Sequence, residues 1–290
     1  MAQETDLYLS APGAPVEPDD ALHEECAVFG IFGLSEEYEA AAHTMLGLHA
    51  MQHRGQEATG IVSFDGETFH AKRGRGEVGE ILNDETVLKS LAGNAAIGHN
   101  RYAPTGEGTD QNIQPLFAEF SSGGFAIAHN GNLTNASALH NRLLASGSLF
   151  QSTTDTEVII HLMARSMQAN LVERLADALH QVEGAFSLVA LSRKKLIGVR
   201  DPLGIRPLVL GRLGGAHILA SETCALDIIG ADLVRDVEPG EMLVIDETGV
   251  VSHFPFPKMA SRFCIFEYIY FARPDSVIEG HSVYQARKQI

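Results

Sequence analysis

The sequence predicts an α+β domain in which strands and paired helices pack in layers. Two observations support this class. Short strand-like apolar segments separated by turn residues dominate after residue 185, whereas residues 36–51 and 152–182 show the apolar spacing of helices. In addition, 45% of the 290 residues are hydrophobic, which is enough to build a full core. Strands packed against helices that are segregated along the chain are typical of a layered α+β fold.

The amino-terminal elements follow from apolar patterning and turn residues. The run Cys26-Ala27-Val28-Phe29-Gly30-Ile31-Phe32 favours a buried strand, and residues 36–51 favour a helix. Strand-like segments at 60–64 and 67–71 flank Asp65-Gly66, which is a hairpin signal. A further apolar run at 95–102 ends in polar groups and precedes the turn-forming residues 103–106.

The remaining elements follow the same rules. Residues 124–128 predict a strand that delivers His129-Asn130-Gly131-Asn132 to a tight turn, because Asn-Gly favours positive φ. Residues 152–156 are rich in N-cap types and begin one helix, and a second helix spans about 171–182. The later strands are predicted at 185–191, 196–200, 208–211, 217–220, 241–245 and 250–254.

Charge and cysteine content exclude several classes of protein. The formal net charge is −16, from 37 acidic and 21 basic residues, so we expect no nucleic-acid partner. No apolar run approaches the roughly 18–20 residues that span a bilayer, so we expect no membrane partner. The three cysteines, Cys26, Cys224 and Cys264, form no C-x-x-C motif. They predict a reducing, cytoplasmic setting rather than a disulfide framework.

Residues 1–25 differ sharply from the sequence that follows. They hold seven acidic residues, three prolines and no Lys or Arg, and they lack the positive start and apolar core of a secretory signal. This composition predicts a disordered acidic tail. The contrast at Glu25–Cys26 suggests that the tail is a propeptide whose removal makes Cys26 the first residue. An ordinary flexible terminus is the alternative.

Cys26 is the candidate nucleophile. A thiol needs a base, and no single His is obviously paired with it in the sequence. As a first residue, Cys26 would carry its own α-amino group, whose pKa of about 7.7–8.0 suits this role. The alternative is that Cys26 is a buried small hydrophobic residue, as unpaired cysteines usually are.

Four other polar positions have two interpretations each. The Asn130 amide and the Gly131 N–H could form an oxyanion hole, or simply belong to a turn. Arg101, at a strand end, could hold a carboxylate or lie on the surface. Asp155 could bind an ammonium group or act as a helix N-cap.

For Arg54, a role outside any functional site is also open. With Glu57, it could form a plain surface ion pair directly after the first predicted helix.

Taken together and in this order, these blocks resemble a known family. The blocks are Cys26-Ala-Val-Phe-Gly, Gln52-His-Arg-Gly-Gln-Glu, Gly98-His-Asn-Arg-Tyr, His129-Asn-Gly-Asn-Leu and Asp155-Thr-Glu. They are similar to the class II glutamine amidotransferase domain, an N-terminal-nucleophile hydrolase. The resemblance implies a four-layer α/β/β/α sandwich.

Later blocks narrow the resemblance to the amidophosphoribosyltransferase family. They are Glu183-Gly-Ala-Phe-Ser, Arg200-Asp-Pro-Leu-Gly-Ile-Arg-Pro-Leu, Ser221-Glu-Thr-Cys-Ala-Leu-Asp and Phe266-Glu-Tyr-Ile-Tyr-Phe-Ala-Arg-Pro-Asp-Ser. Members of this family catalyse the first step of purine biosynthesis. A glucosamine-6-phosphate synthase type of class II amidotransferase, or a non-catalytic fragment, is the alternative.

The resemblance implies roles for individual residues. Cys26 would attack the side-chain amide of glutamine, release ammonia and leave a glutamyl thioester, with its own amino group as base. Asn130 and Gly131 would form the oxyanion hole. Arg101 would hold the α-carboxylate of glutamine and Asp155 its α-ammonium group.

Two further residues are implied to lie at the site. Arg54 would help to order its nucleophile end, and Thr105, in the turn after Arg101, would be a further substrate-binding residue.

The resemblance also implies a second half of the reaction. In the family, ammonia passes to a type I phosphoribosyltransferase domain that needs Mg²⁺, and there displaces pyrophosphate from phosphoribosyl pyrophosphate to give 5-phosphoribosylamine. The phosphate-binding motif of that domain does not occur in these 290 residues. We therefore expect an amidotransferase domain at 26–255, with a connector and the truncated beginning of the transferase domain at 256–290, in a homo-oligomeric enzyme.

Some family members made with a propeptide also carry a structural 4Fe–4S cluster held by four cysteines. Cys264 lies where the resemblance implies one ligand, and the other three would lie outside this sequence. A plain core cysteine is the alternative for Cys264.

Overall fold

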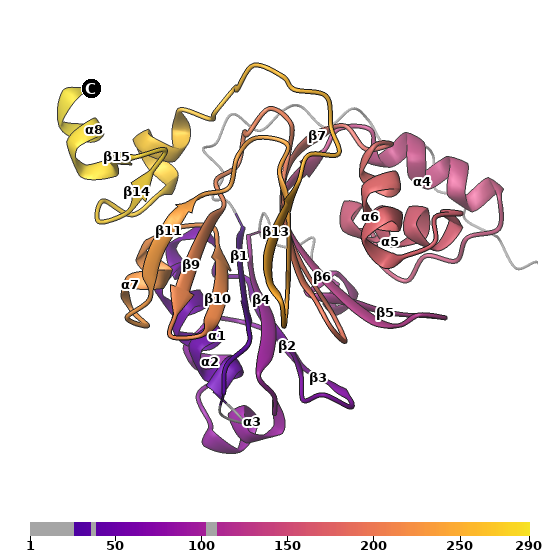
Figure 1. The fold of residues 1–290 in the computed structure, drawn as a ribbon, viewed down its shortest axis with the longest axis horizontal. Coiled ribbons are helices and arrows are strands. Elements are labelled where there is room, and N and C mark those ends of the chain that lie inside the picture. Colours follow the sequence, from indigo (N-terminus) through magenta and orange to yellow (C-terminus); the bar gives the residue numbers. More distant parts are fainter. Residues whose placement is uncertain (1–25, 36–38, 103–108) are drawn as a thin grey trace, which may run out of the picture.

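Two antiparallel sheets lie face to face, and helices cover the outer face of each (Figure 1). The computed structural model describes residues 26–35, 39–102 and 109–290. The order helix, sheet, sheet, helix agrees with the predicted α+β class and with the layers that the resemblance implies.

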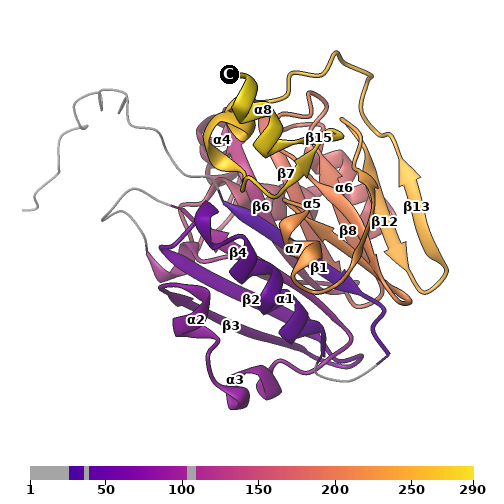
Figure 2. The same ribbon diagram turned by 90° about the vertical axis from the view of Figure 1, so that its left-hand side faces the viewer.

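The first sheet has seven strands. Their order is β11 (Asp232–Asp236), β9 (Val209–Leu213), β10 (Ala216–Ala220), β1 (Ala27–Phe32), β4 (Ala95–Arg101), β2 (Ala58–Phe64) and β3 (Phe69–Arg75). The helices on its side are α1 (Glu39–Ala50), α2 (Val78–Ile81), α3 (Glu85–Ser90) and α7 (Cys224–Asp227). Figure 2 shows α1 lying across the outer face of this sheet.

The second sheet has six strands. Their order is β13 (Gly249–His253), β12 (Met242–Asp246), β8 (Leu196–Arg200), β7 (Gly184–Ser192), β6 (Gly123–Leu133) and β5 (Leu116–Phe120). Its outer face is covered by α4 (Ala136–Ala145), α5 (Asp155–Arg165) and α6 (Leu171–Leu179). Thr154 caps α5, because its side chain accepts a hydrogen bond from the Thr156 N–H.

Three apolar cores separate the layers. One lies between the first sheet and its helices and includes Phe29 and Leu48. A second lies between the two sheets and includes Val28 and Ala128. The third lies between the second sheet and α4–α6. Neighbouring residues of β1 and β6 therefore face different cores, as the side-chain alternation of a strand requires.

The chain after β13 crosses to the side of β9 and β11 (Figure 1). It contains the π-helical turn η3 (Glu267–Phe271), the short hairpin of β14 (Val277–Ile278) and β15 (His281–Ser282), and α8 (Val283–Gln289). The Arg262 N–H donates to the Leu203 carbonyl and the Cys264 N–H to that of Ile205, at 2.7 and 3.3 Å. This segment is therefore attached to the loop after β8.

Most predicted elements are confirmed, including the β2–β3 hairpin with Phe64 opposite Phe69. The predicted tight turn at 129–132 is wrong. These residues continue β6, because they pair with residues 185–188 of β7. The elements that were not predicted are the strands β5, β11, β14 and β15 and the helices α2, α3, α4, α7 and α8.

One smaller expectation is wrong and another is not tested. Asp155 is the first residue of α5, not its N-cap. The turn residues 103–106 lie outside the described residues. Among the residues that are described, no helix is long and apolar enough to cross a membrane.

Close packing of α1 on β1 gives a first prediction. A Cβ atom on Gly47 would lie 2.4 Å from the Phe29 ring, whereas nothing lies within 4 Å of one on Gly79. Gly47→Ala should therefore lower the free energy of unfolding by about 1–3 kcal/mol, as overpacked cores do. Gly79→Ala, the matched control, should be neutral or stabilising by less than about 1 kcal/mol. Urea denaturation measures both, and equal midpoints for the two variants would contradict the close packing.

Candidate active site

A cavity of about 680 Å³ opens where the first residues of β1 meet the end of β6 and the first turn of α5. Four of the predicted site residues line it: Cys26, Arg101, Gly131 and Asp155. They come from both sheets and from a helix of the outer layer. The structure therefore brings together residues that are more than 100 positions apart in the sequence.

Cys26 immediately precedes β1 and is half-buried. It forms no disulfide. The strand behind it is held on both sides: Ala27 pairs with Asn100 of β4, and the Val28 N–H donates to Ser221 Oγ at 3.0 Å. The thiol thus sits at the end of a rigid strand, on the wall of the cavity.

Arg101 is the last residue of β4 and its side chain is 16% exposed. Its Nε lies 3.6 Å from Glu57 Oε2, and the Glu57 N–H donates to the Arg101 carbonyl. Gly55 also lies against the Arg101 main chain, because a Cβ there would be 2.5 Å from its carbonyl carbon. Both partners orient a guanidinium that reaches the cavity.

Asp155 supplies a negative charge on another wall. Its Oδ2 accepts the Leu133 N–H at 2.9 Å, and its Oδ1 lies 3.5 Å from His129 Nδ1. Burial alone would raise the pKa of Asp155, but His129, the Leu133 N–H and the Thr156 hydroxyl outweigh it and lower the pKa to about 2. Asp155 is therefore ionised at neutral pH and can bind a cation.

The end of β6 presents hydrogen-bond donors. The N–H groups of His129 and Leu133 point to the edge of β6 away from β7, where they bind Gln114 Oε1 and Asp155 Oδ2. Alternate residues of a strand direct their N–H groups to the same edge, so the Gly131 N–H points there as well. Gly131 has φ +149°, and a Cβ would lie 2.1 Å from the Ala185 carbonyl oxygen, so only glycine fits.

The side chain of Asn130 is fully buried. Neither its Nδ2 nor its Oδ1 has a hydrogen-bond partner among the described residues. Leaving a buried amide unpaired typically costs about 1–3 kcal/mol. This amide therefore has unused hydrogen-bonding capacity, although Asn130 itself is not among the residues that line the cavity.

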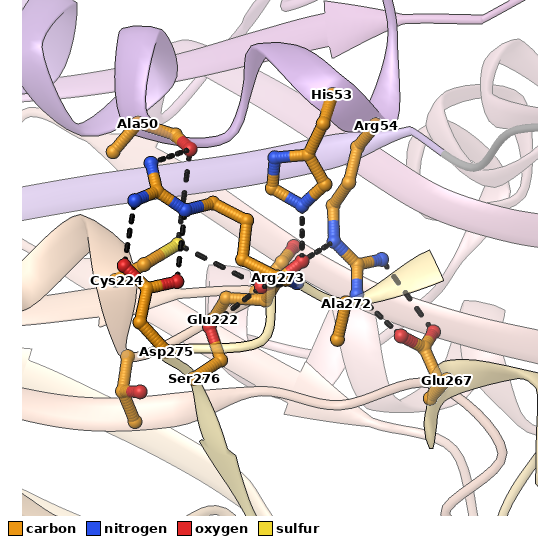
Figure 3. A network of polar contacts seen from close by, with 12 residues as sticks. Ala50, His53, Arg54, Glu222, Cys224, Glu267, Ala272, Arg273, Asp275 and Ser276 are labelled. Carbon is orange, nitrogen blue, oxygen red and sulfur yellow. Dashed lines mark hydrogen bonds and ion pairs between the residues drawn. The ribbon is translucent and has the colours of Figure 1, made fainter. Parts of the chain in front are cut away.

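Arg54 does not line this cavity. It is fully buried between the carboxylates of Glu222 and Glu267 (Figure 3). The interpretation of Arg54 and Glu57 as a surface pair is therefore wrong, because Glu57 faces Arg101 instead. Spacing along the chain could not reveal this, because the partners are 168 and 213 residues away.

Several polar residues on the cavity wall were not predicted. They are Tyr102, Asn112, Gln114, His129, Asn132, Ser137, His140, Asn141, Thr153 and Thr154. His129 and Asn132 belong to a block that the sequence singles out. Ser137, His140 and Asn141 come from α4, which was not predicted.

Comparison with known proteins shows the family. A family model described as a glutamine amidotransferase domain matches residues 99–227. The amidophosphoribosyltransferase of Rhizobium etli is 54% identical over 276 residues, which are 93% of this chain and 55% of that protein. That of Bacillus subtilis is 45% identical over 93% of this chain and 56% of its own length. A chloroplastic one from Vigna aconitifolia is 46% identical over 95% of this chain and 56% of its own.

Solved structures agree. One described as the allosteric regulatory enzyme of purine biosynthesis has a TM-score of 0.87 and 44% identity, over 91% of this chain and 56% of that one. The B. subtilis glutamine phosphoribosylpyrophosphate amidotransferase, complexed with ADP and GMP, has a TM-score of 0.85 and 45% identity over the same shares. The chain belongs to the amidophosphoribosyltransferase family. It corresponds to the glutamine amidotransferase portion and spans about half the length of the relatives it matches.

The resemblance implies roles for two further residues. Thr105 lies outside the described residues. Cys264 is half-buried on the segment after β13 and does not line the cavity. Within the described ranges no group of three or more His, Cys, Asp or Glu side chains could hold a metal ion.

In this member of the amidophosphoribosyltransferase family, Glu222 anchors the segment after β13. Its carboxylate accepts hydrogen bonds from His53 Nε2, the Arg273 N–H and Ser276 Oγ at 2.8, 2.9 and 2.7 Å, in addition to Arg54 (Figure 3). Burial opposes ionisation of Glu222, but Arg54 and the donors hold its pKa well below the usual range. The carboxylate is therefore charged and fully bonded at neutral pH.

Removing this carboxylate should strongly destabilise the fold. Glu222→Leu should cost about 3–5 kcal/mol, because it leaves the buried Arg54 short of a partner. The contribution is present at neutral pH and is lost as the pH falls below about 4, since the pKa is depressed. Asp275→Asn, which removes the exposed partner of Arg273, should cost less than about 1 kcal/mol. Urea denaturation at pH 7 compares them, and similar losses would refute the anchoring role.

Proposed function

We propose that this chain hydrolyses glutamine to glutamate and ammonia, with Cys26 as the nucleophile. One observation carries the proposal. A single cavity holds a thiol, a cation and an anion, namely Cys26, Arg101 and Asp155, together with the outward-facing N–H of Gly131. A zwitterionic amino acid needs a guanidinium for its α-carboxylate and a carboxylate for its α-ammonium group. The side-chain amide would then reach the thiol.

In the proposed first step, the thiol sulfur attacks the amide carbon of glutamine. The Cys26 α-amino group takes the thiol proton and returns it to the departing nitrogen, which leaves as ammonia. Water then cleaves the thioester to give glutamate and restores the thiol. The amine can act as a base only if it is not part of a peptide bond, so we propose that residues 1–25 form a propeptide that is removed.

The negative charge that develops on the amide oxygen would be stabilised by Asn130 and Gly131. The unpaired, buried Asn130 side chain and the edge position of the Gly131 N–H support this role. Such donors act mainly in the transition state, and each is typically worth about 3–4 kcal/mol. Arg54 would act at a distance, because it orders the turn from which Gly55 and Glu57 contact Arg101.

The rest of the proposal concerns a longer enzyme. We propose that residues 26–255 form the amidotransferase domain, and that 256–290 are a connector and the start of a type I phosphoribosyltransferase domain. There, ammonia would replace pyrophosphate on phosphoribosyl pyrophosphate to give 5-phosphoribosylamine, with Mg²⁺, in purine biosynthesis. The names of the relatives support these substrates. We expect a cytoplasmic homo-oligomer, with Cys264 as one ligand if a 4Fe–4S cluster is bound.

The nucleophile gives a direct prediction. In the protein that begins at Cys26, Cys26→Ala should abolish ammonia release from glutamine, because no other residue supplies the attacking thiolate. Cys224→Ser is the matched control and should keep full activity, since burial and Glu222 raise the pKa of the Cys224 thiol to about 12. Ammonia release and the mass of the active protein are the measurements. Full activity in protein that begins at Met1 would refute the proposal and favour another base.

The substrate clamp gives a second prediction. Arg101→Ala should raise the KM for glutamine roughly 10- to 100-fold, because a charge-assisted hydrogen bond contributes about 1.5–3 kcal/mol. The control is Arg212→Ala, which removes an exposed arginine of β9 that bonds to the Gly214 carbonyl. Its KM should be unchanged. Steady-state kinetics distinguishes them, and an unchanged KM for Arg101→Ala would remove this residue from the site.

A further inference from the structure

The strand that carries the proposed oxyanion donors loses one neighbour before it reaches them. On one edge, β6 pairs with β7 along residues 125–133. On its other edge β5 pairs only with residues 123–127, and in the described part of the chain no strand continues beyond them. Asn130 and Gly131 therefore lie on a stretch with a strand on one side only.

Beyond residue 127, two side chains bond to the edge of β6 where a neighbouring strand would otherwise pair. The His129 N–H donates to Gln114 Oε1 at 2.8 Å, and the His129 carbonyl accepts from His99 Nε2 at 3.0 Å. In a sheet, the N–H and C=O of one residue bond to the same neighbouring strand. Gln114 and His99 thus satisfy the two groups that a longer β5 would have bonded.

Both side chains are buried and held rigidly. Gln114 and His99 are 6% and 1% exposed. His99 lies in the middle of β4, opposite Val28 of β1 and Gly60 of β2. The main chain of Gln114 presses on β2, because a Cβ on Gly60 would lie 2.3 Å from the Gln114 carbonyl oxygen. Both anchors are therefore fixed to the first sheet, whereas His129 belongs to the second.

The charge state of this arrangement is fixed. Burial lowers the pKa of His99 to about 3, so the imidazole is neutral at physiological pH and carries one N–H. Because a carbonyl only accepts hydrogen bonds, that proton lies on Nε2. Across the pH range of an assay, neither anchor titrates.

We propose that Gln114 and His99 are positioning residues for the oxyanion hole. Gln114 fixes the peptide before His129 and His99 the peptide after it. Together they aim the Asn130 amide and the Gly131 N–H at the carbonyl oxygen of a glutamine bound at Cys26. This inference rests on the proposed glutaminase function. Oxyanion donors must lie within about 2.7–3.1 Å of the developing charge, so a small rotation of the peptides that flank His129 weakens both donors at once.

The competing interpretation is purely structural. Gln114 and His99 could serve only to satisfy buried polar groups of β6, which would affect stability but not the transition state. The two interpretations differ in kinetics. A positioning role lowers kcat with little change in KM, because oxyanion contacts form only in the transition state.

The test compares variants in the protein that begins at Cys26. Gln114→Met keeps the length of the side chain but removes the acceptor. It should lower kcat for glutamine hydrolysis at least tenfold and change KM less than twofold. The rate of Cys26 alkylation by iodoacetamide, which needs no oxyanion hole, should be unchanged. Gln114→Glu restores an acceptor and should recover most of the lost kcat at pH 8. Gln111→Met, in the same loop but exposed, is the matched control and should behave as wild type.

A second variant removes the other anchor. His99→Phe deletes the donor to the His129 carbonyl and should give the same kcat loss with the same KM. The inference is overturned if folded Gln114→Met and His99→Phe keep wild-type kcat, or if their loss appears in KM. It is also overturned if alkylation of Cys26 slows in parallel with kcat. A wild-type protein that releases no ammonia from glutamine would instead refute the underlying function, which keeps the two failures distinct.

Discussion

Everything at the cavity depends on the packing of the two sheets against each other. Val28 of β1 and Ala128 of β6 belong to the same inter-sheet core, and both are fully buried. Cys26 lies two residues before Val28, and Gly131 lies three residues after Ala128. With extended backbone on both sides, the core contact sets the separation between the thiol and the donors at the end of β6. A nucleophile and an oxyanion hole on different sheets thus need no flexible loop to bring them together.

Charge, rather than apolar area, holds the last part of the chain in place. The small core around Ile278 and Val283 contains only three fully buried apolar residues. The segment also contacts a row of charged side chains of alternating sign, namely Arg206, Glu267, Arg54 and Glu222, of which all but Arg206 are fully buried. Such groups are costly to bury, and displacement of one partner leaves an uncompensated buried charge. The pattern of charges therefore favours a single position of the segment after β13 against the turn that supports Arg101.

Apolar periodicity predicted most of the fold, because helices such as α5 and strands such as β1 each bury one continuous set of side chains. It failed where the deciding contact is distant. Asn130-Gly131 has the local chemistry of a turn, yet pairing with Ser187 and Phe186 of β7 keeps it extended. In the exposed edge strand β11, the alternation of apolar and polar residues is too weak to predict a strand. In the site, the charged and nucleophilic residues stood out as motifs.

Of the residues that support the site, His99, Glu222 and Glu267 lie in the blocks that carry the resemblance, but nothing in the sequence indicated their partners. Gln114 and His99 act on His129, and Glu222 and Glu267 act on Arg54, through contacts that only the folded chain creates. The proposed chemistry then depends on one covalent bond, the peptide bond between Glu25 and Cys26. Arg101, Asp155 and the β6 donors are in place in the chain as given, which still carries residues 1–25. What this form lacks is an amine at Cys26, since that nitrogen is an amide in it. Cleavage before Cys26 would therefore supply the base that the proposed chemistry requires.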